Sequence, residues 1–196
     1  RPLLLPLSTA NKIIFEGNNI LDWSASLSFK KIDYIKKENE KIIFSIHNIE
    51  KKTIISITLN DFEPDFEKIF LQSPDLKANF YWDANSENII IEYAPSISRF
   101  IALNTSNNSI TYLGRIQPDA KIINGAWNQN NNLFIYQTDQ NELYSVNILS
   151  DPDKAVKISD NISGFAVKND LIYYLDVKNL YLYSFSLNNQ ANKKQI

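Results

Sequence analysis

Residues 127–136 read Trp-Asn-Gln-Asn-Asn-Asn-Leu-Phe-Ile-Tyr, and residues 82–91 read Trp-Asp-Ala-Asn-Ser-Glu-Asn-Ile-Ile-Ile. Both stretches open with tryptophan, continue through a polar, Asn-containing segment, and carry large apolar residues seven and nine positions after the tryptophan. Alternate apolar positions are the period of one face of a β-strand. Each stretch therefore predicts a polar turn that leads into a half-buried strand.

This unit occurs four times, and its opening aromatic residues are Trp23, Trp82, Trp127 and Phe165. After Phe165 the same offsets give Ile172 and Tyr174, and the Trp23 unit fits with Ile32 and Tyr34 if its turn is two residues longer. A second strand repeats a tighter pattern of two large apolar residues, a small one, an apolar one and a polar one: Ile43-Phe44-Ser45-Ile46-His47, Phe100-Ile101-Ala102-Leu103-Asn104, Leu143-Tyr144-Ser145-Val146-Asn147 and Leu182-Tyr183-Ser184-Phe185-Ser186. Four matches in register indicate an internal repeat.

The opening aromatic residues lie 59, 45 and 38 residues apart. The last two spacings are typical of a propeller blade of about 40–45 residues. Solenoid units of similar length contain a helix or one short strand, whereas each unit here holds three or four strand-like runs and no helical period. We therefore predict an all-β chain, a β-propeller of four-stranded antiparallel blades, with the four aromatic residues buried at equivalent blade positions.

The repeat divides the chain into segments. We expect a linker or tail at 1–10, the last strand of a preceding blade at 11–17, blades at 18–75, 76–120 and 121–160, and an incomplete blade at 161–196. The extra residues of the first blade fall at 60–74, which predicts a projecting loop or short helix. Two arrangements are open: the amino-terminal strand completes the fourth sheet of a closed four-bladed propeller, or the chain is an arc of a larger one. An opening Arg1 in place of Met favours the arc.

The two stretches quoted first resemble the Trp-Ser-Pro-Asp-Gly-x-x-Ile-Ala-Phe signature of TolB-like (PD40, WD40-like) propeller repeats, and Trp23-Ser24-Ala25-Ser26 is similar. Asn104 and Asn147 stand where that family has Asp in its second-strand pattern. The resemblance extends from about residue 11 to the end, but the Asp-Gly turn is absent. It implies the propeller fold and no single function, because such repeats serve unrelated proteins. A looser resemblance, to bacterial propellers carried beyond a membrane anchor and a PEGA-type domain, implies an extracytoplasmic or membrane-anchored location at the cell surface.

Composition excludes several classes of function. The chain has 20 Lys and Arg against 22 Asp and Glu, spread evenly, so no basic stripe is available for nucleic acid. The pairs Lys30-Lys31, Lys36-Lys37 and Lys51-Lys52 flank strand-like runs and are expected at solvated edges and turns. The absence of cysteine excludes disulfides and thiolate metal sites. No stretch has the ~18–20 apolar residues of a transmembrane helix, so we expect any membrane contact to require an anchor outside this segment.

No catalytic, cofactor or metal site is predicted. His47 is the single histidine, and by the repeat it occupies the polar slot of Asn104 and Asn147 rather than a ligand position. The carboxylates Asp61, Glu63, Asp65 and Glu67 alternate, but their spacing and Pro64 do not fit a calcium loop. The sequence contains no Gly-x-Ser-x-Gly elbow and no phosphate-binding glycine motif. The tyrosines of the last unit suit a sugar-binding surface or the core, and alternation puts at least half of them between sheets: Tyr173, Tyr174, Tyr181 and Tyr183.

We therefore expect a non-catalytic scaffold or binding module for a protein, peptide or glycan. The alternative is the propeller part of a hydrolase, either a glycosidase or the gating domain of a serine peptidase. Loops vary at the least cost to packing, so the candidate recognition loops are those that precede each opening aromatic: 18–22, 77–81, 121–126 and 161–164.

Overall fold

The structure, a computed structural model, describes residues 4–7, 10–13, 19–39, 41–61, 78–83, 85–94, 99–107, 109–115, 120–128, 133–147, 150–186 and 189–196. These residues form four antiparallel four-stranded sheets and one two-stranded sheet, with a single short 3-10 turn at Leu59–Asp61 among them. The prediction of an all-β chain made of four-stranded antiparallel blades is confirmed.

Each four-stranded sheet is a blade whose strands follow one another in sequence. Blade 1 contains β3 (Ile20–Ala25), β4 (Lys31–Glu38), β5 (Lys41–Asn48) and β6 (Thr53–Thr58). Blade 2 contains β7 (Asn79–Trp82), β8 (Asn88–Ala94), β9 (Arg99–Asn104) and β10 (Ser109–Arg115). Blade 3 contains β11 (Ile122–Asn128), β12 (Leu133–Thr138), β13 (Leu143–Asn147) and β14 (Asp151–Ser159). Blade 4 contains β15 (Ile162–Lys168), β16 (Leu171–Asp176), β17 (Leu182–Ser186) and β18 (Asn189–Gln195).

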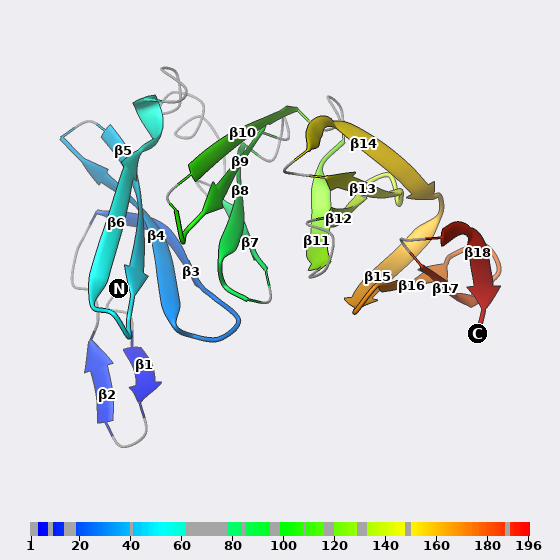
Figure 1. Cartoon of the computed structure of the whole chain (residues 1–196), viewed down its shortest axis with the longest axis horizontal. Helices are drawn as coiled ribbons and strands as arrows, with labels where there is room; N and C mark the ends of the chain where they lie inside the picture. Colours follow the sequence, from blue (N-terminus) through cyan, green and yellow to red (C-terminus); the bar gives the residue numbers. More distant parts are fainter. Residues whose placement is uncertain are drawn as a thin grey trace.

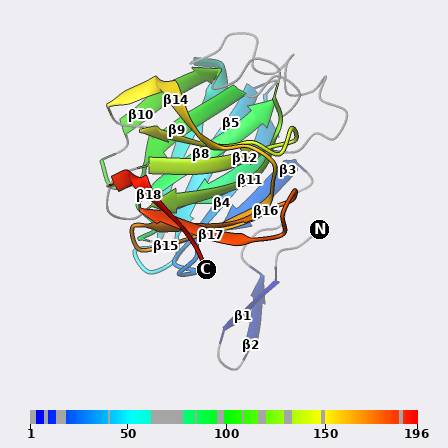
Figure 2. The ribbon, with the colours of Figure 1, turned by 90° about the vertical axis from the view of Figure 1, so that its right-hand side faces the viewer.

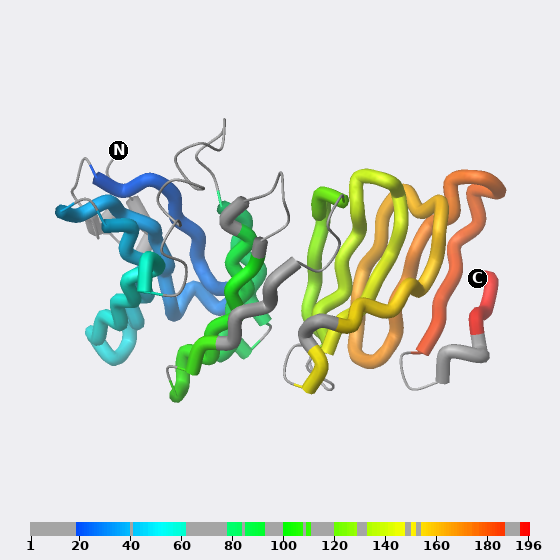
Figure 3. The backbone as a smooth tube through the Cα atoms, turned by 90° about the horizontal axis from the view of Figure 1, so that it is seen from above, coloured from blue at the N-terminus to red at the C-terminus, as the bar shows by residue number. Residues whose placement is uncertain are grey.

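The blades are arranged radially in an open arc (Figure 1). The first strand of each blade (β3, β7, β11, β15) lies on the concave side, and the last strand lies on the convex side. Seen along the arc, the sheets stack one behind another (Figure 2), and from above they form a row from blade 1 to blade 4 (Figure 3). Each inner blade therefore has a leading face toward the preceding blade and a trailing face toward the following one.

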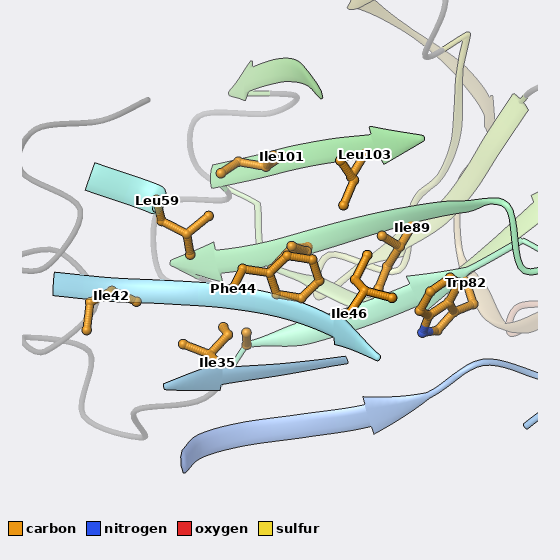
Figure 4. Close-up of a cluster of buried hydrophobic side chains, with 11 residues drawn as sticks. Ile35, Ile42, Phe44, Ile46, Leu59, Trp82, Ile89, Ile101 and Leu103 are labelled. Carbon is orange, nitrogen blue, oxygen red and sulfur yellow. The ribbon is translucent and has the colours of Figure 1, made fainter. Parts of the chain in front are cut away.

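The hydrophobic core consists of three layers, one at each junction between neighbouring blades. At the first junction Ile35, Phe44 and Ile46 of blade 1 pack against Trp82 and Ile89 of blade 2 (Figure 4). The second layer joins blades 2 and 3, and the third joins blades 3 and 4. Because an inner blade is covered on both faces, its central strand reads as a continuous buried run, as in residues 134–138 of β12.

Two expectations about the chain ends are wrong. The last blade is complete, because β18 pairs with β17; its sequence, rich in Asn, Gln and Lys, has no apolar alternation to reveal a strand. Residues 10–13 (β2, Ala10–Ile13) do not act as the last strand of a blade: they pair with β1 (Leu4–Leu7) in a separate hairpin. Residues 14–17, the rest of the expected 11–17 strand, lie outside the described residues.

Non-glycine residues adopt the left-handed backbone conformation in several turns, because glycine is scarce in this chain. Asn supplies four of the eight described non-glycine positions with positive φ: Asn39, Asn141, Asn161 and Asn169. The other four are Phe29, Lys52, Ser86 and Leu180. Asn tolerates this conformation through local hydrogen bonds of its side chain, whereas Phe29 and Ser86 take it in turns that are described below.

Candidate functional site

A polar cavity of about 390 Å³ lies between blades 1 and 2, at the end of the blades where β3 turns into β4 and β7 turns into β8. Four turns and their adjoining strand ends form its wall. We name it the junction pocket; it is lined by Lys30, Lys31, Ile46, Asn48, Glu50, Lys51, Thr53, Ile55, Asn85, Ser86, Glu87, Thr105 and Ser106.

Lys31 crosses from blade 1 to blade 2 in the wall of this pocket. Its Nζ donates to the backbone carbonyl of Ser86 over 2.5 Å and to Oγ1 of Thr105 over 2.6 Å. Burial lowers the pKa of Lys31, although the carboxylates of Glu87 and Asp83 oppose that shift. An ammonium group that is held by two oxygen acceptors and partly shielded from water interacts more strongly with an anion than an exposed one does.

Two matching turns build the wall on either side. The turn at 26–31 has hydrogen bonds from the Ser26 amide to the Lys31 carbonyl (2.9 Å) and from the Phe29 amide to the Ser26 carbonyl (2.8 Å). The turn at 83–88 repeats both bonds, with Ser86 in the place of Phe29. The φ of Phe29 is 55° and that of Ser86 is 59°. The hydroxyls of Ser28 and Ser86 lie 2.9 Å apart and tie the two turns together, so the rim of the pocket is held in place before any ligand arrives.

The charged groups of the junction pocket are mixed, with an excess of one cation. Lys30 forms a 3.1 Å salt bridge with Glu50, and both side chains are exposed. Lys51 is also exposed, and its charge contributes to lowering the pKa of Lys31. With Ser, Thr and Asn side chains completing the wall, the pocket offers hydrogen-bond donors together with positive charge.

A buried carboxylate lies at the same junction, outside the pocket lining. Oδ1 of Asp33 accepts hydrogen bonds from the Trp82 indole Nε1 (2.8 Å) and from Oγ of Ser24 (2.7 Å). Burial raises the pKa of Asp33 to about 6, against the opposing effect of these two hydrogen bonds. At the next junction the Trp127 indole donates to the backbone carbonyl of Tyr81 over 2.9 Å. The two tryptophans therefore each connect a blade to the one before it.

The four opening aromatic residues do not occupy one equivalent position, which corrects the prediction. Trp82 pairs with Ile89 and Trp127 pairs with Phe134, at the same position before the turn. In blade 4 that position belongs to Val167, and Phe165, which pairs with Tyr174, lies two residues before it. The matching turns at 26–31 and 83–88 place Ala25 where blade 2 has Trp82, so Trp23 is also two residues early.

The burial of these residues also differs from the prediction. Trp82 is 8% exposed and Trp127 and Phe165 are half-buried, but Trp23 is 46% exposed, so the prediction that it is mostly buried is wrong. Trp23 lies on the leading face of blade 1, and no described blade precedes it. Blade 1 covers Trp82, whereas no described blade covers Trp23, although both tryptophans open a repeat in the sequence.

His47 does not share a strand position with Asn104. The Ile49 amide donates to the Lys30 carbonyl as the Thr105 amide donates to the Glu87 carbonyl, so Asn48 is the counterpart of Asn104. The side-chain oxygens of Asn48, Asn104 and Asn147 all accept a backbone amide from the turn that follows. Among the described residues, no group of three or more His, Asp or Glu side chains is placed to hold a metal ion.

The prediction of recognition loops before the opening aromatic residues is wrong, because most of these residues belong to the first strands themselves: β3, β7, β11 and β15 begin at residues 20, 79, 122 and 162. These strands begin at the opposite end of the blades from the junction pocket. The described residues of the predicted loops take part in packing between strands and blades. Oδ2 of Asp22 accepts the Ala78 amide (2.9 Å), and the Lys121 carbonyl accepts the Asp139 amide (2.8 Å). In the acidic segment, Asp61 ends the short 3-10 turn, while Glu63, Asp65 and Glu67 lie outside the described residues, as do Asn18 and Lys77 of the loops.

The tyrosines of the last unit divide between the core and the surface. Tyr174 is buried and stacks on Tyr183 with a centroid distance of 5.6 Å, toward blade 3, and Lys193 Nζ lies 4.2 Å from the Tyr183 ring. Tyr181 is half exposed, and Tyr173 lies on the trailing face of blade 4.

Sequence reasoning missed Lys31, Ser86 and Thr105, which form the wall of the pocket. Lys31 was expected at a solvated edge with Lys30, yet alternation from Ile35 and Asp33 puts Lys31 on the trailing face of blade 1. That period was visible in the sequence. Its carbonyl and hydroxyl partners were not, because they belong to blade 2 and are distant in sequence.

No family model matches the sequence, and no curated protein matches it. Solved structures do. A prolyl endopeptidase, one of two analysed for the role of inter-domain dynamics in catalysis and specificity, has a TM-score of 0.62 at 11% identity. An uncharacterized protein from Listeria monocytogenes EGD-e has a TM-score of 0.59 at 18% identity, and a nidogen/laminin complex one of 0.52 at 7%.

The matches span most of this chain but only part of the compared chains. They cover 90–96% of this chain, which spans 31% of the prolyl endopeptidase chain, 52% of the Listeria chain and 67% of the chain matched in the nidogen/laminin complex. Among the described residues, no helix is long and apolar enough to cross a membrane. Identities this low show the fold alone: the chain forms the blades of a β-propeller.

Proposed function

We propose that this chain is a recognition module, a β-propeller scaffold that binds a protein, peptide or glycan rather than transforming it. The observation that carries the proposal is the junction pocket, whose wall holds the Lys31 ammonium between the Ser86 carbonyl and the Thr105 hydroxyl. The hydrogen bonds between its turns hold the pocket in its open shape, and a preformed site has a lower cost of binding than one that must be ordered.

The chemistry of the wall favours a ligand group with oxygen acceptors and negative charge. Hydroxyl, amide and ammonium donors surround the cavity, and cations exceed anions by one in its lining. The carboxylate of an acidic peptide side chain or of an acidic sugar fits these donors. We therefore propose an acidic peptide or glycan as the ligand, bound across the junction of blades 1 and 2.

The resemblance to TolB-like repeats supports an assignment to that group of propellers, and the looser resemblance to propellers carried beyond a membrane anchor and a PEGA-type domain supports an extracytoplasmic or cell-surface location. Of the structural neighbours, the nidogen/laminin complex is by its name an assembly of two proteins. That neighbour supports a binding role but does not indicate a ligand.

A hydrolase role for the larger protein is the second candidate. The observation that favours it is the likeness to the prolyl endopeptidase, of which this chain spans about a third. In this case the chain is the gating propeller of a peptidase, and the catalytic groups belong to a part of the protein outside the propeller.

Binding arrays of acidic and neutral glycans and peptides, run beside a screen for glycoside and peptide hydrolysis, test the two candidates. We expect binding of acidic members without turnover, and a loss of at least about tenfold in affinity for Lys31→Met. Lys168→Met, an exposed lysine of blade 4, is the matched control and should bind as the parent does. Turnover that is lost on changing one carboxylate, or equal binding by both lysine variants, would contradict the proposal.

A further inference from the structure

The trailing face of blade 4 is apolar, and none of the described residues covers it. It consists of Ala166 on β15, Leu171, Tyr173 and Leu175 on β16, and Leu182 and Ser184 on β17. Leu171 and Leu175 are each 37% exposed, and Leu182 is 41% exposed. In repeat proteins a unit face that meets water is polar. This face departs from that rule.

The face resembles the trailing face that blade 3 turns toward blade 4. Strand pairing aligns the two blades: Leu171 pairs with Ser186 as Leu133 pairs with Asn147, and Leu175 pairs with Leu182 as Gln137 pairs with Leu143. In this register Leu182, Leu171, Ser184 and Ala166 of blade 4 match Leu143, Leu133, Ser145 and Ala126 of blade 3. Four of the six positions are therefore identical.

The positions that correspond to Leu182 and Leu175 in blades 1, 2 and 3, each of which is followed by another blade, are buried. Leu182 at 41% exposure matches Leu143 and Phe100, which are fully buried at 0%, and Phe44 at 1%. Leu175 at 37% matches Gln137 at 3% and Glu92 at 0%. The same face is thus buried three times in this molecule by the leading face of a neighbouring blade.

We propose that the trailing face of blade 4 is a docking surface for a further four-stranded blade. The likeness of the two faces, identical at four of six positions, defines the partner, because the leading face of blade 4 already fits the face of blade 3. The docked blade carries a leading face of the blade 4 type, with aromatic and β-branched residues in the places of Phe165, Ile172, Tyr174 and Phe185. Docking buries Leu171, Leu175 and Leu182 and extends the arc by one blade.

The test uses the full chain extended at its carboxyl end by a second copy of residues 160–196, so that a blade of the required type follows blade 4. We expect the extended chain to melt about 5 °C or more above the parent. Leu182→Glu in the original blade should change the Tm of the parent by less than about 2 °C, because the site is exposed there. In the extended chain the same change buries a charge, and it should lower the Tm by at least about three times as much. Leu180→Glu, at a 74% exposed turn position, is the control and should have a small effect in both chains.

Each other outcome overturns the proposal. An extended chain whose added segment is removed by brief proteolysis, or in which Leu182→Glu costs no more than in the parent, shows that a blade does not dock there. Light scattering on the unextended chain provides the second measurement. A dimer that Leu182→Glu converts to monomer would mean that the face takes a second copy of the chain instead of a further blade.

Discussion

The indole Nε1 of Trp82 donates a 2.8 Å hydrogen bond to the buried carboxylate of Asp33, so a charged side chain of blade 1 anchors the aromatic residue that opens blade 2. Ser24 completes the pair by donating to the same oxygen. The junction of these blades is thus polar at its centre and apolar around it. The arrangement has consequences for the pH dependence of stability and for substitutions at the other tryptophans.

Asp33→Asn should stabilise the protein at neutral pH. The pKa of Asp33 is about 6 in the folded state and near 3.8 in an exposed chain. The folded protein therefore holds the proton more tightly, and the stability this contributes is fully present below about pH 4 and is lost as the pH rises through 6. The loss is on the order of 3 kcal/mol at pH 7. Urea unfolding at pH 4 and pH 7.5 should show a gain for the variant at the higher pH alone.

The quantity to compare is the difference in free energy of unfolding between the parent and Asp33→Asn at each pH. Glu92 is also buried with a raised pKa, but it affects both proteins equally and cancels in this difference. A variant that loses the same stability at both pH values would show that the ionisation of Asp33 is not coupled to folding.

Trp82→Phe should cost more than Trp127→Phe. Both changes remove an indole donor, but Trp82 serves a buried carboxylate and Trp127 a backbone carbonyl. Hydrogen bonds to charged groups contribute about 1.5–3 kcal/mol against roughly 1 kcal/mol for neutral ones. Trp23→Phe, at the exposed position, should change the free energy of unfolding by less than about 0.5 kcal/mol. Chemical denaturation of the three variants measures the ranking of their free energies of unfolding. Equal losses for Trp82→Phe and Trp127→Phe would mean that the hydrogen bond to Asp33 adds no stability beyond that of a neutral hydrogen bond.

Gly125→Ala should destabilise the junction of blades 2 and 3, whereas Gly164→Ala should not destabilise blade 4. A Cβ on Gly125 would lie 2.6 Å from the Phe134 ring and 2.8 Å from the Tyr81 ring, while nothing lies within 4 Å of the same atom on Gly164. Overpacking of this kind costs about 1–3 kcal/mol, which corresponds to about 2–4 °C in Tm per kcal/mol for a domain of this size. Thermal melts of both variants provide the comparison, and a Tm for Gly125→Ala equal to that of the parent would mean that the rings move aside freely.

The sequence by itself determined the repeat and its class of fold. Alternating apolar residues around Phe134 and Ile89 are visible without any structure, because a strand with one face in the core must carry them. Asn-rich turns and two of the tryptophans follow the same repeat. These features are local, and each depends on the residues within one blade.

Only the tertiary structure decided the features that depend on neighbouring blades. Trp23 and Trp82 look alike in sequence, yet a preceding blade covers one and not the other. β18 has no apolar alternation in its sequence, so only its pairing with β17 shows that it is a strand. In the sequence Lys31 is one half of a lysine pair; in the structure its ammonium group donates a hydrogen bond to the Ser86 carbonyl of blade 2. A residue's own periodicity specifies which face of its strand it occupies, but what lies against that face is set by another segment of the chain that is distant in sequence.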